Sequence, residues 1–135
     1  MTQGRNPPQS PSKGRSASVL VIDDSDIDRQ VIADLLANAG YTVHQLPSPI
    51  GATRKARDLQ VGVVVIDQNL PSLDGSKLAA LFRNAGLSDL RVILTSSSDE
   101  LSMLEITKRA KADAFVAKQR LREDLVETVR RLLGK

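Results

Sequence analysis

Residues 61–75 read VGVVVIDQNLPSLDG, and this stretch decides the fold. Its first part, residues 61–66, is apolar and nearly all β-branched, as expected for a central strand buried on both faces. Asp67 follows that run, and Pro71 and Gly75 then favour a turn before the next helix. A strand buried on both faces belongs in a parallel sheet with helices on each side.

Outward from this strand, short apolar runs alternate with segments of helical period from Ser18 onward. The expected strands are 19–22, 41–46, 61–66, 91–95 and 114–117. The expected helices are 28–39, a segment ending near 58, 76–84, 99–110 and a last helix whose apolar positions are Leu121, Leu125, Val126, Val129, Leu132 and Leu133. Strict alternation predicts an α/β fold: a doubly wound (βα)5 sandwich around a five-stranded parallel sheet. In such sheets the chemistry collects outside the carboxyl ends of the strands.

Length and composition point to one folded unit. The chain has 135 residues, of which 41% are hydrophobic, so it can bury a core without a metal or a disulfide. Residues 1–17 are rich in Pro, Gly and Ser, so we expect a disordered basic tail there and one domain over 18–135. The absence of Cys excludes a disulfide scaffold and a cysteine nucleophile, and the single His44 disfavours a multi-histidine metal site.

The net charge of +3 is divided unevenly along the chain. Residues 1–17 carry +3, residues 18–107 carry −5 and residues 108–135 carry +5. A basic end can bind an anionic ligand through its field, although a solvated helix face is the more ordinary explanation. No apolar run approaches the roughly 18 to 20 residues of a membrane span, and no secretory signal is evident, so we expect a cytoplasmic protein.

Carboxylates stand at the ends of two expected strands. Asp23 and Asp24 follow the first strand, and Asp67 follows the third. Grouped carboxylates repel one another unless a cation compensates, and Mg²⁺ prefers oxygen ligands. Together they therefore predict a Mg²⁺ site. The alternative is helix capping, which Asp24 or Ser25 would provide.

Hydroxyl groups and an ammonium group end the last two strands. The fourth strand runs into Thr95, Ser96, Ser97 and Ser98, and the fifth ends at Lys118. A carboxylate, a hydroxyl and an ammonium at one edge suit a group with charged oxygens, such as phosphate. The chain has no Gly-rich nucleotide loop, which leaves a carboxylate that itself accepts a phosphoryl group.

The segments VLVIDDSD, VVVIDQNLPSLDG, VILTSSSDE and ADAFVAKQ, in this order, resemble the phosphoacceptor receiver domain of two-component response regulators, over about residues 18–133. The resemblance implies a flavodoxin-like fold and makes Asp67 the residue that a histidine kinase or histidine phosphotransfer protein phosphorylates. It makes Asp23, Asp24, Asp67 and the backbone carbonyl of Asn69 the Mg²⁺ ligands.

The same resemblance implies a switch. Ser96 matches the hydroxyl that bonds the phosphoryl group, with Thr95 as its competitor, and Lys118 matches the lysine that pairs with that group. Phe115 matches the aromatic residue that turns inward, and Pro71 and Gly75 match the conformational residues of the loop after the acceptor. The family lysine is commonly followed by a cis proline; Gln119 stands there instead, so we expect a trans peptide and a re-aimed loop.

Since only 17 residues precede and about two follow the expected domain, we expect a stand-alone receiver of the chemotaxis type, without a DNA-binding output domain or catalytic activity beyond self-phosphorylation and slow dephosphorylation. It would signal to a protein partner through its fourth helix, fifth strand and fifth helix. One alternative is a binding module whose basic last helix, with Arg120, Arg122, Arg130 and Arg131, recognises an anionic ligand such as a nucleotide second messenger. Another is a receiver excised from a larger hybrid kinase.

Overall fold

Five parallel strands form one sheet in the computed structural model, which describes residues 16–134. The strand order is β2-β1-β3-β4-β5, so the order reverses between β1 and β3. The strands are β1 (Ser18–Ile22), β2 (Thr42–Leu46), β3 (Val63–Asp67), β4 (Arg91–Ser96) and β5 (Ala114–Ala117). This is the doubly wound, flavodoxin-like sandwich that the alternation predicts.

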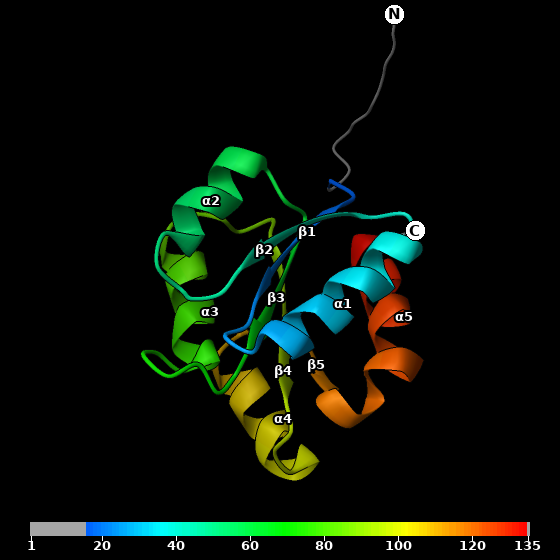
Figure 1. Cartoon of the computed structure of the whole chain (residues 1–135). Helices are drawn as coiled ribbons and strands as arrows, with labels where there is room; N and C mark the ends of the chain where they lie inside the picture. The colour runs from blue at the N-terminus through cyan, green and yellow to red at the C-terminus, as the bar shows by residue number, and fades with distance from the viewer. Residues whose placement is uncertain (1–15, 135) are drawn as a thin grey trace, which may run out of the picture.

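Helices cover both faces of the sheet. They are α1 (Asp26–Asn38), α2 (Ala52–Leu59), α3 (Gly75–Asn84), α4 (Glu100–Arg109) and α5 (Leu121–Leu133), with a short 3-10 turn, η1 (Lys118–Arg120), before α5. Figure 1 shows α1 and α5 on one side of the sheet and α2, α3 and α4 on the other. Right-handed crossovers between parallel strands require this placement.

Two apolar clusters hold the layers together, because alternate residues of each buried strand point to opposite faces. Leu20, Val64 and Leu94 belong to the cluster beneath α2, α3 and α4, with Phe82 at its centre fully buried. Val21 and Val65 belong to the cluster beneath α1 and α5. The two strands where the order reverses, β1 and β3, are thus buried at every residue, including Asp67 at the end of β3.

Element boundaries differ from the expected ones by a few residues. Helix α1 begins at Asp26 rather than 28, because the Ser25 hydroxyl caps it by accepting from the Asp28 N–H at 3.2 Å. Strand β3 begins at Val63 rather than 61, since its pairing with β1 starts at Val19 and Val63. Most of the expected tail, residues 1–15, lies outside the described residues, although the Ala17 carbonyl accepts a hydrogen bond from the Thr42 N–H at 3.3 Å.

Two further expectations concern the backbone. Every peptide bond among residues 16–134 is trans, including the bond before Gln119, as expected without proline there. No helix in the described part of the chain is long and apolar enough to cross a membrane.

Candidate functional site

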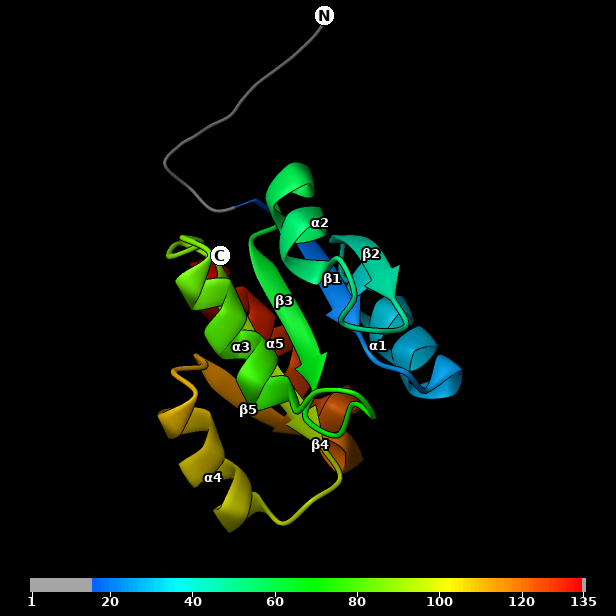
Figure 2. The same cartoon turned by 90° about the vertical axis from the view of Figure 1, so that its left-hand side faces the viewer.

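The site lies at the carboxyl edge of the sheet, where β1 and β3 end side by side at the switch point. In Figure 2 the arrowhead of β3 points to the loop that follows Asp67. Asp67 is the last residue of β3 and only 4% exposed, and Asp23, which directly follows β1, is 1% exposed. Burial of two strand-end carboxylates is costly unless other groups compensate.

Three carboxylates converge here. Each of Asp23, Asp24 and Asp67 offers an oxygen atom, and these oxygens lie within 4.8 Å of one another. Asp23 and Asp67 are buried and Asp24 is exposed. The structure therefore unites the three acids that the sequence analysis assigned to one site.

Backbone donors orient the two buried carboxylates. The Ser25 N–H donates to Oδ1 of Asp23 at 2.9 Å, and the Asn69 N–H donates to Oδ1 of Asp67 at 3.0 Å. The Arg29 guanidinium donates to the Asp23 carbonyl at 2.7 Å and so braces the turn between β1 and α1. Each carboxylate keeps its Oδ2 atom for a cation.

Lys118 supplies that cation at the end of β5. Its Nζ lies 3.1 Å from Oδ2 of Asp23, 3.5 Å from Oδ2 of Asp67 and 2.9 Å from Oδ2 of Asp28. Burial alone would lower the pKa of Lys118, but the hydrogen bond to Asp28, the close contact with Asp23 and the negative charges of Asp23 and Asp67 outweigh burial and raise it. The lysine is therefore firmly protonated.

The pKa of Asp23 is raised above its ordinary value. Burial is the main cause and the charge of Asp67 adds to it, while the Ser25 N–H and Lys118 oppose it. Burial thus outweighs the two groups that stabilise the charged form of Asp23.

The residues present suit a divalent cation. The Oδ2 atom of Asp23 is buried and has no hydrogen-bond partner of good geometry, only the ion pair with Lys118. Several carboxylate oxygens around one point are the donor set that Mg²⁺ prefers. Asp23, Asp24 and Asp67 would hold the ion.

Ser96 and Asn69 form the border of the site toward β4. The fully buried Ser96 hydroxyl accepts a hydrogen bond from the Ser98 N–H at 2.9 Å and lies 3.4 Å from the Asn69 amide nitrogen, which donates to it. Thr95, its competitor in the sequence, instead directs its hydroxyl to the Ile66 carbonyl at 3.5 Å. Of the two hydroxyls, that of Ser96 therefore contacts the loop that follows Asp67.

Phe115, the aromatic residue expected to take part in a switch, lies on the last strand of the sheet. It is on β5, opposite Leu94 in register, and packs half-buried against the cluster beneath α2, α3 and α4. His44 is half-buried on the edge strand β2 and does not belong to the carboxylate group.

The loop after Asp67 is braced by Gln68 and Gly75. The Gly75 N–H donates to the Gln68 carbonyl at 3.0 Å, and the Ser76 N–H donates to the Gln68 side-chain oxygen at 2.9 Å. A Cβ at Gly75 would lie 2.6 Å from the Asp67 carbonyl oxygen and 2.8 Å from the Gln68 Cα, so only glycine fits. Pro71 is exposed in this loop.

Sequence reasoning missed Asp28, Arg29 and Gln68. Asp28 lies 90 positions before Lys118, so no local pattern indicates their contact. The one available signal was Ser25, which marks a helix start and places Asp28 in the first helical turn.

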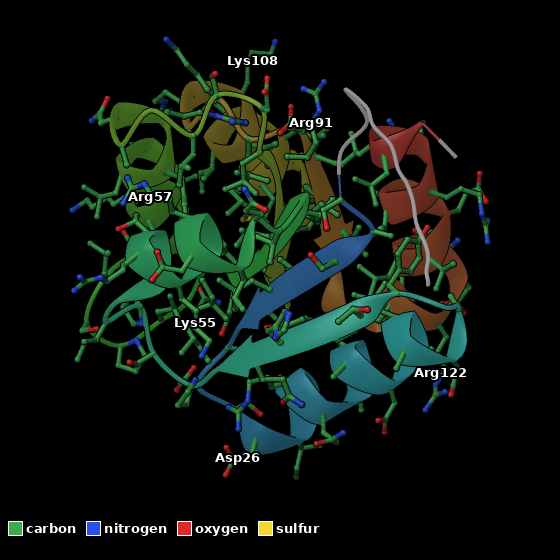
Figure 3. The ribbon with its side chains drawn as sticks, turned by 90° about the horizontal axis from the view of Figure 1, so that it is seen from above. Asp26, Lys55, Arg57, Arg91, Lys108 and Arg122 are labelled. Carbon is green, nitrogen blue, oxygen red and sulfur yellow. The ribbon has the colours of Figure 1, made fainter. Side chains whose placement is uncertain are left out.

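Two of the four arginines expected on the basic last helix pair with nearby acids. Arg120, the last residue of η1, pairs with Asp124 of α5 at 3.1 Å, and Arg130 pairs with Glu127 within α5 at 2.7 Å. Figure 3 places Arg122 far from Arg57, Arg91 and Lys108. These charges are dispersed over several faces.

Comparison with known proteins gives one family. The sequence model of the response regulator receiver domain matches residues 19–130. Protein PilG of Pseudomonas aeruginosa is 28% identical over 113 residues, which cover 83% of this chain and 84% of PilG. Sensor histidine kinase RcsC of Escherichia coli is 31% identical over 70 residues, which are 52% of this chain but only 7% of the kinase.

The fold has close counterparts among solved structures. Chemotaxis protein CheY4 of Vibrio cholerae is 25% identical, with a TM-score of 0.79 over 87% of this chain and 99% of that one.

Proposed function

The chain belongs to the response regulator receiver domain family, and from that premise we propose that Asp67 accepts a phosphoryl group from a histidine kinase or a histidine phosphotransfer protein. The observation that carries this proposal is the meeting of Asp23, Asp24 and Asp67 within 4.8 Å, with the Lys118 ammonium 3.5 Å from Asp67. A carboxylate becomes an effective acceptor where positive charge offsets the charge that develops on the incoming phosphoryl oxygens.

The transfer is a displacement at phosphorus. A carboxylate oxygen of Asp67 forms the new P–O bond while the donor's P–N bond breaks, and that electron pair stays on the imidazole nitrogen. The Asn69 N–H, 3.0 Å from Oδ1 of Asp67, holds the carboxylate in one orientation. Lys118 compensates charge on the transferred group. Mg²⁺, when bound, supplies further charge compensation on the phosphoryl oxygens.

Phosphorylation would then move the Ser96 hydroxyl toward the phosphoryl group. To do so, Ser96 must give up its hydrogen bonds with Asn69 and Ser98, both of which belong to loops at this edge. Phe115 would fill the released space and shift the surface formed by α4, β5 and α5. Leu101 and Leu104 of α4 are 76% and 52% exposed, which favours a protein partner at this surface.

Intact-mass measurement after incubation with acetyl phosphate and Mg²⁺ tests the assignment. We expect the parent protein to gain the mass of one phosphoryl group and Asp67→Asn, which keeps the side-chain shape, to gain none. An Asp99→Asn protein is the matched control, because Asp99 is an exposed N-cap of α4. Equal incorporation in the parent and Asp67→Asn proteins would refute the proposal.

Stand-alone action and origin in a larger hybrid kinase both remain predictions. The chain spans most of PilG but a small fraction of RcsC. The anionic-ligand alternative has less support, because two of its four arginines are paired with acids three or four positions away in the sequence.

A further inference from the structure

Lys118 is closer to Asp28, on α1, than to the proposed acceptor. Its Nζ lies 2.9 Å from Oδ2 of Asp28 and 3.5 Å from Oδ2 of Asp67. The contact with Asp28 is a hydrogen bond as well as an ion pair. In this state the lysine is held between α1 and β3.

The start of α1 explains why Asp28 is available to the lysine. Ser25 caps the helix and Asp28 lies three residues later, where an acidic side chain often turns back to the N–H of the cap residue. Here the Ser25 N–H already donates to Oδ1 of Asp23 at 2.9 Å. The Asp28 carboxylate is therefore left to bind Lys118.

The two partners of this ion pair differ in exposure. The Lys118 side chain is 16% exposed and that of Asp28 is 40% exposed. Such a pair is weaker than a fully buried one, because water solvates the carboxylate that remains when the lysine leaves. A phosphoryl group on Asp67 carries additional negative charge, so it attracts the Lys118 ammonium more strongly than the Asp28 carboxylate does.

We propose that Asp28 is a positioning residue for Lys118: it holds the lysine in the resting protein, and the phosphoryl group on Asp67 must displace it. This inference rests on the proposed function. Its consequence is that the Asp28 pair lowers the affinity of the site for a phosphoryl group, and that phosphorylation frees a carboxylate in the first turn of α1.

Beryllofluoride with Mg²⁺, a mimic of a bound phosphoryl group, provides the first test by calorimetric titration. Asp28→Asn removes the competing charge while keeping the side-chain shape, and we expect it to bind beryllofluoride about two- to fivefold more tightly, the range for partly exposed ion pairs. Asp26→Asn is the matched control. Asp26 (labelled in Figure 3) lies in the same helical turn. Its side chain is 86% exposed, and it pairs with Arg29 at 2.6 Å. We expect Asp26→Asn to bind beryllofluoride with the affinity of the parent protein.

The effect must also depend on the lysine. In a Lys118→Met background, Asp28→Asn should leave the affinity for beryllofluoride unchanged. Three outcomes would each overturn the inference. They are tighter beryllofluoride binding by Asp28→Asn even in the Lys118→Met background, equally tighter binding by Asp26→Asn, and weaker binding by Asp28→Asn. Unfolding curves for every variant ensure that folded proteins are compared.

A second readout needs no phosphoryl group. The proton–nitrogen NMR signal of the Lys118 ammonium, assigned by its loss in Lys118→Met, should shift in metal-free Asp28→Asn and stay in place in Asp26→Asn. If that shift occurs but Asp67 accepts no phosphoryl group, the resting pair exists and the proposed function fails, and the displacement fails with it. If Asp67 is phosphorylated but the signal does not shift, only this inference fails.

Discussion

Replacing Lys118 by Met removes the cation among the site carboxylates while keeping the apolar stem of the side chain. At the 3.1 Å separation from Asp23, the attraction is about 5 kcal/mol with an effective dielectric constant of ~20. Desolvation of the two groups opposes that attraction, and breaking a buried pair costs about 3–5 kcal/mol.

Two features reduce this cost. Asp28 is 40% exposed and can be solvated when the lysine is gone, and Asp23, whose pKa is already raised, can take up a proton. We therefore expect Lys118→Met to lower the free energy of unfolding of the metal-free protein by about 2–4 kcal/mol. Urea denaturation followed by circular dichroism in a chelating buffer measures it.

Mg²⁺ should reduce the loss of unfolding free energy caused by Lys118→Met, because the ion compensates the same carboxylate charges that the lysine compensates. A ligand at about 100 times its Kd stabilises a folded protein by about 2.7 kcal/mol, and the variant should gain more than the parent since its site lacks the competing ammonium. We expect the difference between parent and variant to fall to about half or less in saturating Mg²⁺.

Alkaline pH provides an independent check on the lysine. Its pKa is raised in the folded protein, so its contribution is complete below 10.5, the ordinary lysine value, and is lost as the pH rises through the folded value. The difference in free energy of unfolding between the parent and Lys118→Met should stay constant from about pH 7 to 10 and become smaller above that range.

Two results would refute the reasoning. One is a metal-free loss under about 0.5 kcal/mol, the range of ordinary surface substitutions. The other is a loss that Mg²⁺ leaves unchanged. Lys77→Met, at an exposed position of α3, is the control and should stay within about 0.5 kcal/mol of the parent.

Three other perturbations have defined outcomes. Gly75→Ala should lower the free energy of unfolding, measured by urea denaturation, by about 1–3 kcal/mol and weaken Mg²⁺ binding, because the added Cβ meets backbone atoms of Asp67 and Gln68. Unchanged stability and Mg²⁺ affinity would contradict this close approach. Gln60→Gly should raise the unfolding free energy by about 0.5–1 kcal/mol, because Gln60 ends α2 with φ of 53°, and a loss of stability would count against strain there. Mg²⁺ affinity should begin to fall with decreasing pH while the pH is still above 3.8, the ordinary carboxyl value, because the raised pKa of Asp23 lets protons compete with the ion there. A calorimetric affinity that stays constant down to that pH would contradict this expectation.

The strand-end residues illustrate how far local sequence reaches. The β-branched run before Asp67 and the apolar run before Asp23 identify two strands buried on both faces, and parallel strands in a doubly wound sheet present their carboxyl ends at one edge. Convergence of Asp23, Asp67 and Lys118 therefore follows from the order of elements. Boundaries were less accurate: β3 begins at Val63, where pairing with β1 begins, and that register is not visible in a local pattern.

Local sequence patterns were enough to predict the class of fold, the edge where the polar strand ends meet and the residue types gathered there, because each segment carries its own period-2 or helical pattern. Only the tertiary structure decided which carboxylate binds the lysine most closely. The pair of Asp28 and Lys118 joins residues 90 positions apart, and it arises because the Ser25 N–H is already bound to Asp23 while α1 packs against α5, the helix that follows Lys118. Such a contact depends on angles and distances between packed elements, which no single segment encodes.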